Sequence, residues 1–140
     1  MNDDIKLKLC ALAADAQRSA YAPYSRYKVG AALLAESGKI YTGCNIENAA
    51  FGPTVCAERV AIFKAVSEGE REFCMIAVAG GDLSAGASPC GVCRQVLSEF
   101  CKEDFVILSV KDGGKAYDSY TLGELLPHSF SAGEHMSAHG

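Results

Sequence analysis

Residues 73–80, FCMIAVAG, form a nearly unbroken apolar run that has the length of a strand. Such a run is typical of a strand covered on both faces, because a strand with one wet face alternates apolar and polar side chains. Helical patterns precede and follow it, over residues 56–69 and 90–100. The sequence therefore predicts a sheet with helices packed on both of its faces.

The remaining segments extend this alternation of helices and strands. Residues 3–20 carry apolar side chains at helical spacing. Ser37-Gly38 lies between two strand-like runs and signals a hairpin, and Gly113-Gly114 separates two more. These four runs span residues 28–36, 39–47, 104–110 and 115–121. We expect an α/β fold in the order α-β-β-α-β-α-β-β, a three-layer α-β-α sandwich with one mixed five-stranded sheet.

Length and charge narrow the classes of function. The 140 residues suffice for a sizeable core, and we expect a single domain over residues 1–130 with a loose tail over 131–140. The net charge of −4 argues against binding to nucleic acid or to an anionic membrane. No apolar run approaches about 20 residues, and acids stand at the N-terminus where a signal peptide has bases. We therefore expect a cytoplasmic protein.

Seven cysteines are many for such a chain, and an odd number fits a purely disulfide framework poorly. Cys56 and Cys90 each begin a predicted helix, and Cys93 follows Cys90 on the same helix face. The free N–H groups and partial positive charge of a helix N-terminus lower the pKa of a thiol. Because zinc prefers a tetrahedron of sulfur and nitrogen ligands, these three cysteines are candidate zinc ligands.

The fourth ligand decides whether such a site is structural or catalytic. Cys44 and His128 are the rival protein ligands, and either would close the tetrahedron around a structural zinc. We interpret Cys10, Cys74 and Cys101 as small core residues. If no protein ligand takes the fourth position, water takes it and the site is of the catalytic kind.

Three charged residues lie next to the candidate ligands. Glu58 can approach Cys56 only over the end of the helix, where its carboxylate could accept a proton from zinc-bound water. The alternative is an ordinary acid in a first helical turn, which the helix dipole favours. Arg59 and Arg94 each follow a ligand closely, and we expect both to donate to cysteine sulfur and reduce the negative charge there. The alternative for both is a solvated helix residue.

Cys56-Ala57-Glu58, together with Pro89-Cys90-Gly91-Val92-Cys93, is the all-cysteine form of the zinc deaminase pattern. Longer stretches extend the match. They are YAPYSRYKVGAALL (21–34), GCNIENAAF (43–51), CAERVAIFKAVSEG (56–69), SPCGVCRQVLSEF (88–100) and ELLPHSF (124–130). From residue 21 to residue 130 the chain closely resembles the small homotetrameric cytidine deaminases.

This resemblance implies hydrolytic deamination of cytidine and 2′-deoxycytidine to uridine and 2′-deoxyuridine, with release of ammonia, in pyrimidine salvage. It also implies one Zn²⁺ per subunit, a homotetramer and a small nucleoside substrate, with neither nucleic acid nor membrane as partner. Hydroxide formed at the zinc would attack C4 of the cytosine ring. Glu58 would take the proton of that water, deliver it to N3 and later help the amine to leave.

The resemblance also assigns residues to the substrate. Asn45 and Glu47 share a strand face and correspond to a pair that holds ribose hydroxyls; otherwise they are a polar strand end. The backbone of Ala57 corresponds to a donor to the pyrimidine O2. Tyr27 and Phe130 correspond to aromatics that pack on the base, Phe130 from a neighbouring subunit, whereas the plain alternative for both is core packing.

Three positions depart from the family pattern. Tyr27 stands where Phe is common, Phe51 where Tyr is common, and Lys28 where Pro is common. Phe51 cannot donate a hydroxyl hydrogen bond, so these departures concern substrate preference and leave the chemistry intact. Two other functions stay open: a structural-zinc binding module, and a deaminase of a polynucleotide or of another cytosine-containing small molecule.

Overall fold

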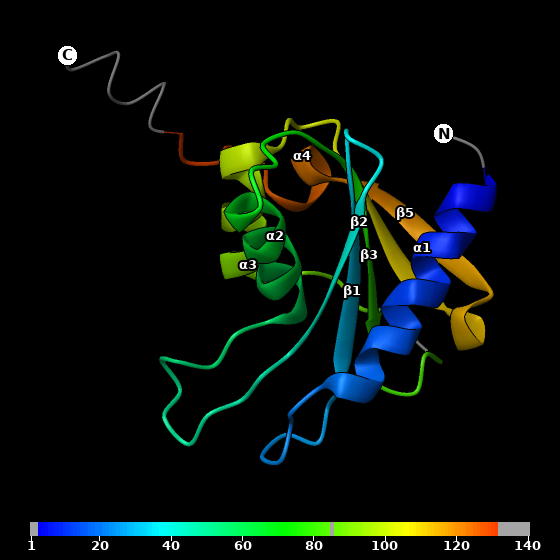
Figure 1. Ribbon diagram of the computed structural model, residues 1–140, viewed down its shortest axis with the longest axis vertical. Helices are drawn as coiled ribbons and strands as arrows, with labels where there is room; N and C mark the ends of the chain where they lie inside the picture. The colour runs from blue at the N-terminus through cyan, green and yellow to red at the C-terminus, as the bar shows by residue number, and fades with distance from the viewer. Residues whose placement is uncertain (1–2, 85, 132–140) are drawn as a thin grey trace.

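The computed structural model describes residues 3–84 and 86–131, so the predicted tail over 131–140 lies outside the described residues except for its first. Figure 1 shows a sheet between two layers of helices, with α1 on one face and α2 and α3 on the other. In chain order the elements are α1 (Asp3–Ala16), η1 (Gln17–Ser19), β1 (Val29–Ala35), β2 (Ile40–Cys44), α2 (Ala57–Ser67), β3 (Phe73–Gly80), α3 (Gly91–Phe100), β4 (Val106–Lys111), η2 (Asp112–Gly114), β5 (Ala116–Thr121) and α4 (Leu122–Leu125). The predicted three-layer α/β sandwich is confirmed. Its predicted elements occur in the expected order, and the structure adds α4 and two 3-10 turns.

The sheet is mixed, as predicted. Its five strands lie in the order β2-β1-β3-β4-β5. β3 and β4 run parallel, with Ala77 opposite Leu108, and the other neighbouring pairs are antiparallel. A parallel pair needs a crossover connection, and α3 lies within the one that joins β3 to β4. None of the helices in the described part of the chain is long and apolar enough to cross a bilayer.

The core has two halves, one on each face of the sheet. On one face Ile76 packs in a cluster with residues of α2 and α3 such as Ile62 and Leu97. On the other face Ala77 packs in a cluster with residues of α1 such as Leu9. Neighbouring residues of β3 therefore enter different halves of the core, which explains why the sequence of this strand is apolar without alternation.

The first helix is shorter than the predicted range of residues 3–20. It ends at Ala16 and continues as the 3-10 turn η1. Gln17, at the start of this turn, is buried, and its amide nitrogen donates to the carbonyl oxygens of Lys28 and Gly81, both at 3.0 Å. The end of α1 is thus attached to the loop before β1 and to the loop after β3.

The strand predicted over residues 39–47 ends at Cys44. The next residue, Asn45, turns its side-chain amide onto the loop before β1. Its Oδ1 accepts from the amide of Val29 and its Nδ2 donates to the carbonyl of Tyr27, both at 2.8 Å. These contacts join segments far apart in the sequence, so the local pattern of residues 39–47 cannot reveal where the strand ends.

Gly43 in β2 allows the first turn of α2 to approach the sheet. A Cβ atom at this position would lie 2.4 Å from the carbonyl oxygen of Ala57 and 2.6 Å from the amide nitrogen of Ala61. Both are backbone atoms of the helix, so no side chain could move aside. The absence of a side chain at Gly43 therefore fixes the position of the α2 N-terminus.

We predict that Gly43→Ala displaces α2 and lowers the free energy of unfolding by about 1–3 kcal/mol, as overpacking does in other cores. Gly52→Ala is the matched control, because a Cβ there meets no atom within 4 Å. Thermal and chemical unfolding of the two variants gives the comparison. Equal stability of both variants would show that α2 does not depend on this approach.

Candidate active site

Three cysteine sulfurs converge where α2 and α3 begin. Cys56 is the residue that precedes α2, and Cys90 precedes α3 in the same way. Cys93 lies in the first turn of α3 and is fully buried. The Sγ of Cys90 lies 3.6 Å from that of Cys56 and 3.4 Å from that of Cys93, and all three sulfurs lie within 4.8 Å of one another.

This geometry fits zinc. A tetrahedral zinc ion with Zn–S bonds of about 2.3 Å holds its sulfur ligands about 3.8 Å apart. In the described part of the chain the group contains these three ligand atoms and no other from Cys, His, Asp or Glu. Cys44 and His128, the rival fourth ligands, therefore lie outside it. Three protein ligands with an open fourth position are typical of a catalytic zinc site.

The electrostatics of the cysteines also fit a divalent cation. The pKa of Cys56 is lowered to about 5, mainly by a hydrogen bond from Cys93 and also by the Arg59 guanidinium. Burial acts in the opposite direction but is outweighed. Cys93 donates to Cys56 and is buried, and both effects raise its own pKa. The protein groups thus favour the thiolate of Cys56 and disfavour that of Cys93. A cation beside these sulfurs would favour the thiolate form of both.

Glu58 is the buried acid of the site. It is the second residue of α2 and its exposed fraction is 3%. Burial, together with the negative charge of Cys56, raises the pKa of Glu58 to about 7, although hydrogen bonds to the carboxylate oppose the shift. A carboxyl group of this kind can accept a proton and release it near neutral pH, as a group that shuttles protons must.

A cavity of about 460 Å³ opens beside Glu58 and the cysteines. Cys56, Cys90 and Glu58 line it, together with four of the residues predicted to hold substrate: Tyr27, Asn45, Glu47 and Ala57. The fifth, Phe130, is not among its lining residues. Its side chain is 63% exposed, and its carbonyl accepts from Gln95 of α3 at 3.2 Å.

The polar pair Asn45 and Glu47 already has partners within the chain. Asn45 makes the two backbone contacts described above. The carboxylate of Glu47 accepts from the backbone amides of Tyr24 and Ser25, at 3.0 and 3.1 Å, and from the Ser25 hydroxyl. These hydrogen bonds, that from the hydroxyl foremost, lower the pKa of Glu47. Both residues therefore shape the cavity by holding the loop before β1, and each keeps unused hydrogen-bonding capacity toward a ligand.

The comparison with known proteins agrees with this site. Residues 3–109 match the family described as "Cytidine and deoxycytidylate deaminase zinc-binding region". The chain belongs to this deaminase family. The three-cysteine group is thus the part of a zinc-binding deaminase domain that fits the metal.

Relatives match over nearly their full length. A cytidine deaminase of Sporosarcina psychrophila is 50% identical over 124 residues, which are 89% of this chain and 90% of that protein. A cytidine deaminase of Halalkalibacterium halodurans is 48% identical over 120 residues, 86% of this chain and 89% of that protein. The crystal structure of cytidine deaminase from Burkholderia pseudomallei aligns with a TM-score of 0.81 and 43% identity, covering 88% of this chain and 97% of that one.

The two arginines of this deaminase domain behave differently. Nη2 of Arg59 donates to Sγ of Cys56 at 3.3 Å. Nε of Arg59 is the one buried side-chain nitrogen or oxygen in the described residues that has no hydrogen-bond partner. Arg94 does not make the expected contact with sulfur. It donates to the carbonyls of Pro89 (2.7 Å) and Leu125 (2.8 Å) and to the Ser88 hydroxyl (3.2 Å), because these oxygens surround its guanidinium.

Serine side chains support the deaminase site in ways that the sequence analysis missed. Ser25 holds Glu47, as described. Ser109 of β4 is buried, and its hydroxyl donates to the carbonyl of Ala87 at 2.5 Å, which supports the loop before Cys90. The one signal in the sequence was a polar residue within the apolar run of residues 105–110, which is typical of a buried hydroxyl with a specific partner.

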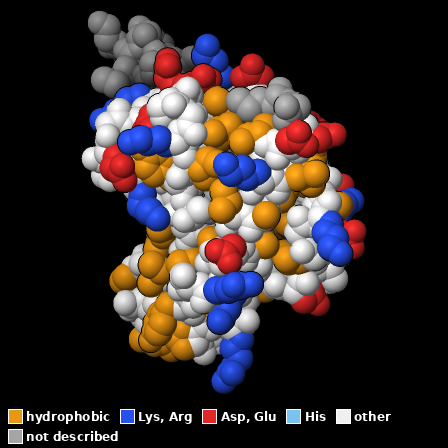
Figure 2. All heavy atoms as spheres, turned by 45° about the vertical axis from the view of Figure 1, so that its right-hand side comes forward, with side chains coloured by type: hydrophobic (Ala, Val, Ile, Leu, Met, Phe, Trp, Pro, Cys, Tyr) orange, Lys and Arg blue, Asp and Glu red, His pale blue; other side chains and the backbone are white. Residues whose placement is uncertain are grey.

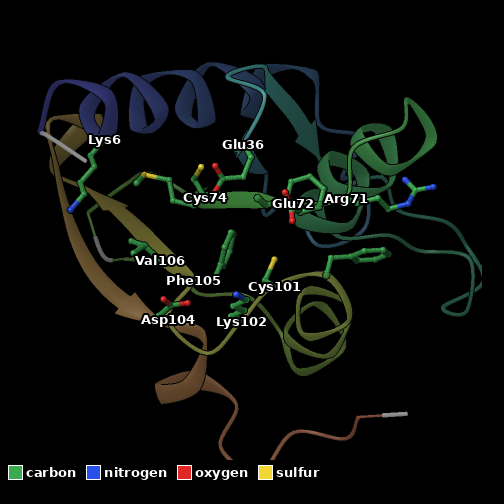
Figure 3. Close-up of a pocket in the computed structure, with 13 residues that line it drawn as sticks. Lys6, Glu36, Arg71, Glu72, Cys74, Cys101, Lys102, Asp104, Phe105 and Val106 are labelled. Atoms are coloured by element: carbon green, nitrogen blue, oxygen red, sulfur yellow. The ribbon is translucent and has the colours of Figure 1, made fainter. Parts of the chain in front are cut away.

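A second cavity, of about 630 Å³, lies at the start of β3, where Cys74 and Met75 line it (Figure 3). The cavity beside Glu58 lies near the other end of this strand, at Val78. Its wall carries acids and bases such as Glu36 and Lys102, and Figure 3 shows Cys74 and Cys101 among them. Both cysteines are half-buried and pack at the edge of the core, not within it as expected, whereas Cys10 is fully buried as predicted. Burial raises the pKa of Cys101 to about 12, so this thiol stays protonated.

We predict that Cys90→Ala removes zinc from the purified protein, since two thiolates bind the ion far more weakly than three. Cys44→Ala and His128→Ala should keep about one zinc per chain, because neither residue belongs to the ligand group. Metal analysis by mass spectrometry after dialysis measures the three contents. Loss of zinc from either of the last two variants would instead indicate a closed, structural site.

Proposed function

We propose that the protein is a zinc-dependent cytidine deaminase that hydrolyses cytidine and 2′-deoxycytidine to uridine and 2′-deoxyuridine plus ammonia, in pyrimidine salvage. The observation that carries the proposal is the buried Glu58 beside three converging thiols, in a cavity of about 460 Å³. Membership of the deaminase family and 50% identity with a cytidine deaminase support it. Residues 1–130 form the catalytic domain in this proposal.

Cys56, Cys90 and Cys93 hold one Zn²⁺ per subunit. When bound, the ion supplies Lewis acidity, which lowers the pKa of a water ligand to about 7. Three thiolates on a divalent ion leave the site with a net charge of −1. Arg59 donates to the sulfur of Cys56 and so withdraws part of this negative charge. The contribution of Arg59 is to limit the loss of Lewis acidity that three thiolates would cause.

Glu58 moves the protons of the reaction. Its carboxylate takes a proton from the attacking water and delivers it to N3 of the cytosine ring, which makes C4 more electrophilic. The same group then assists the departure of the C4 amine as ammonia, while the oxygen of the water remains on C4. One carboxyl group can serve all these transfers because its pKa, raised to about 7 by burial, lies near the working pH.

The loop before β1 and the loop after β2 hold the nucleoside. Asn45 and Glu47 bind ribose hydroxyls through the hydrogen-bonding capacity that their internal contacts leave unused. The backbone amide of Ala57 donates to the pyrimidine O2. The Tyr27 ring packs on the base; it lies against Gly80 and Gly81, where an added Cβ would come within 2.9 Å of ring carbons. This placement, and an exposed fraction of 48%, argue against core packing for Tyr27.

We infer a homotetramer in which Phe130 reaches the base in a neighbouring subunit. Figure 2 shows hydrophobic side chains gathered at the lower end of the molecule, the end at which Figure 1 places the loops around residues 20–28 and 46–55. Phe51, 93% exposed, and Tyr24, 61% exposed, belong to these loops. Large aromatic side chains this exposed support a contact in which another subunit covers these loops. All seven cysteines are free, which suits a cytoplasmic location.

Ultraviolet absorbance of cytidine, followed with zinc-loaded protein, tests the function. We expect conversion to uridine that stops with a zinc chelator and returns when zinc is restored, because the fourth ligand position is needed for water. Activity on cytidine should change little with salt, since the substrate carries no phosphate backbone. No turnover of cytidine by zinc-loaded protein, or activity confined to polynucleotides, would refute the proposal.

Glu58→Gln tests the proton shuttle separately from the metal. The amide is isosteric but cannot carry a proton from water to N3. We therefore predict normal zinc content and a loss of kcat greater than about 10²–10⁴-fold, the usual effect of one proton transfer, because several transfers use this group. Metal analysis together with steady-state kinetics checks both parts. A variant with full zinc and nearly full kcat would assign the proton transfers to another group.

A further inference from the structure

We propose that Arg94 is a positioning residue, which clamps the loop carrying the ligand Cys90 to the C-terminal segment of the chain. The inference rests on the proposed zinc-dependent function and adds a role for this side chain. In that role the fork shape of the guanidinium matters, because its N–H groups donate to three oxygen atoms. The clamp consists of the three hydrogen bonds to Pro89, Leu125 and Ser88.

Two of these bonds hold the residues that directly precede Cys90. Nε donates to the carbonyl of Pro89 at 2.7 Å, and Nη2 donates to the hydroxyl of Ser88 at 3.2 Å. Cys90 itself is exposed and makes no side-chain hydrogen bond that would cap α3. Its sulfur is therefore held in place by its own loop, and Arg94 fixes that loop from the side of α3.

The third bond reaches a distant part of the sequence. Nη1 donates to the carbonyl of Leu125 at 2.8 Å, and Leu125 is the last residue of α4. Carbonyl groups in the last turn of a helix have no partner within the helix, so they need one from elsewhere. The neighbouring Gln95 donates to the carbonyl of Phe130 at 3.2 Å. Adjacent residues of α3 thus hold both ends of the segment 125–130.

The same loop is held from the sheet as well. The Ser109 hydroxyl of β4 donates to the carbonyl of Ala87 at 2.5 Å. Ala87, Ser88 and Cys90 all line the cavity that contains Glu58. A shift of this loop would therefore move one zinc ligand and one wall of the cavity together. Arg94 consequently affects zinc affinity and the KM for substrate through the same displacement.

Arg94 could act through its three hydrogen bonds or through its positive charge, and a change of side-chain shape at constant charge distinguishes the two roles. Arginine presents its N–H donors in a rigid planar fork, whereas lysine carries the same charge on a single compact ammonium group. Three acceptors on the loop and on α4 surround the guanidinium, and one ammonium nitrogen cannot reach all of them in the same geometry. Arg94→Lys therefore removes the clamp and keeps the positive charge beside the ligands.

The experiment compares Arg94→Lys and Arg94→Ala with Arg71→Lys. Arg71 also donates to two backbone carbonyls, those of Val66 and Glu70, but it lies at the far end of α2. Zinc affinity is measured on purified protein by competition with a chromophoric chelator, and kcat and KM are measured with cytidine. We expect Arg94→Lys to weaken zinc binding about 10–100-fold and to raise KM, whereas Arg71→Lys stays within about threefold of wild type.

Two outcomes would overturn the clamp. Wild-type zinc affinity and KM in Arg94→Lys, with both impaired in Arg94→Ala, would show that charge is the relevant property. A lowered melting temperature with unchanged zinc affinity in both variants would show a merely structural role. If Arg94→Ala does not fold, Arg94→Lys alone decides, because it keeps the charge and most of the stem.

A variant of the neighbouring residue separates the two ends of the clamp. Gln95→Leu removes a contact to the same C-terminal segment but none to the loop before Cys90, so it should keep wild-type zinc affinity. A loss of zinc as large as that in Arg94→Lys would contradict the proposal. Failure of the wild type to bind zinc or convert cytidine would instead refute the proposed function itself.

Discussion

The site depends on one electrostatic constraint: thiolates that lie close together repel each other, and a cation between them relieves that repulsion. The pKa of Cys56 falls to about 5 while that of Cys93 rises, so the protein groups favour the thiolate of Cys56 over that of Cys93. Zinc removes this conflict and links α2 to α3. The metal therefore contributes to the fold as well as to the chemistry, because both helices must begin at the same point.

The sheet brings these helix ends together because α2 and α3 pack on the same face of it. Gly43 of β2 lets the first turn of α2 press against the strand, and α3 arrives as part of the crossover between two parallel strands. Glu58 lies in this first turn of α2 and is buried, and burial raises its pKa to about 7. The first turn of α2 thus brings Cys56 and a carboxyl group with a raised pKa close together, as the proposed proton transfers require.

The order of elements was predictable because each helix and strand has its own local pattern, and the three cysteines were predictable because their spacing places them at helix starts. The ends of α1 and β2 were not, since Gln17 and Asn45 bind backbone atoms far away in the sequence. The partners of Glu47 were missed for the same reason. Local periodicity carries no information about a side chain whose acceptor lies in another loop.

Arg59 and Arg94 show this limit most clearly. Arg59 follows Cys56 by three residues and Arg94 follows Cys90 by four, so both lie one helical turn beyond a ligand. Arg94, however, lies beside the end of α4, where a free carbonyl accepts its N–H, whereas Arg59 has sulfur as its partner and keeps one buried nitrogen unpaired. The three sulfurs are consequently not equivalent. Cys56 receives a hydrogen bond from a charged donor, whereas Arg94 binds the loop that precedes the exposed Cys90. In the two proposals above, the arginines therefore support the same metal by different physical means.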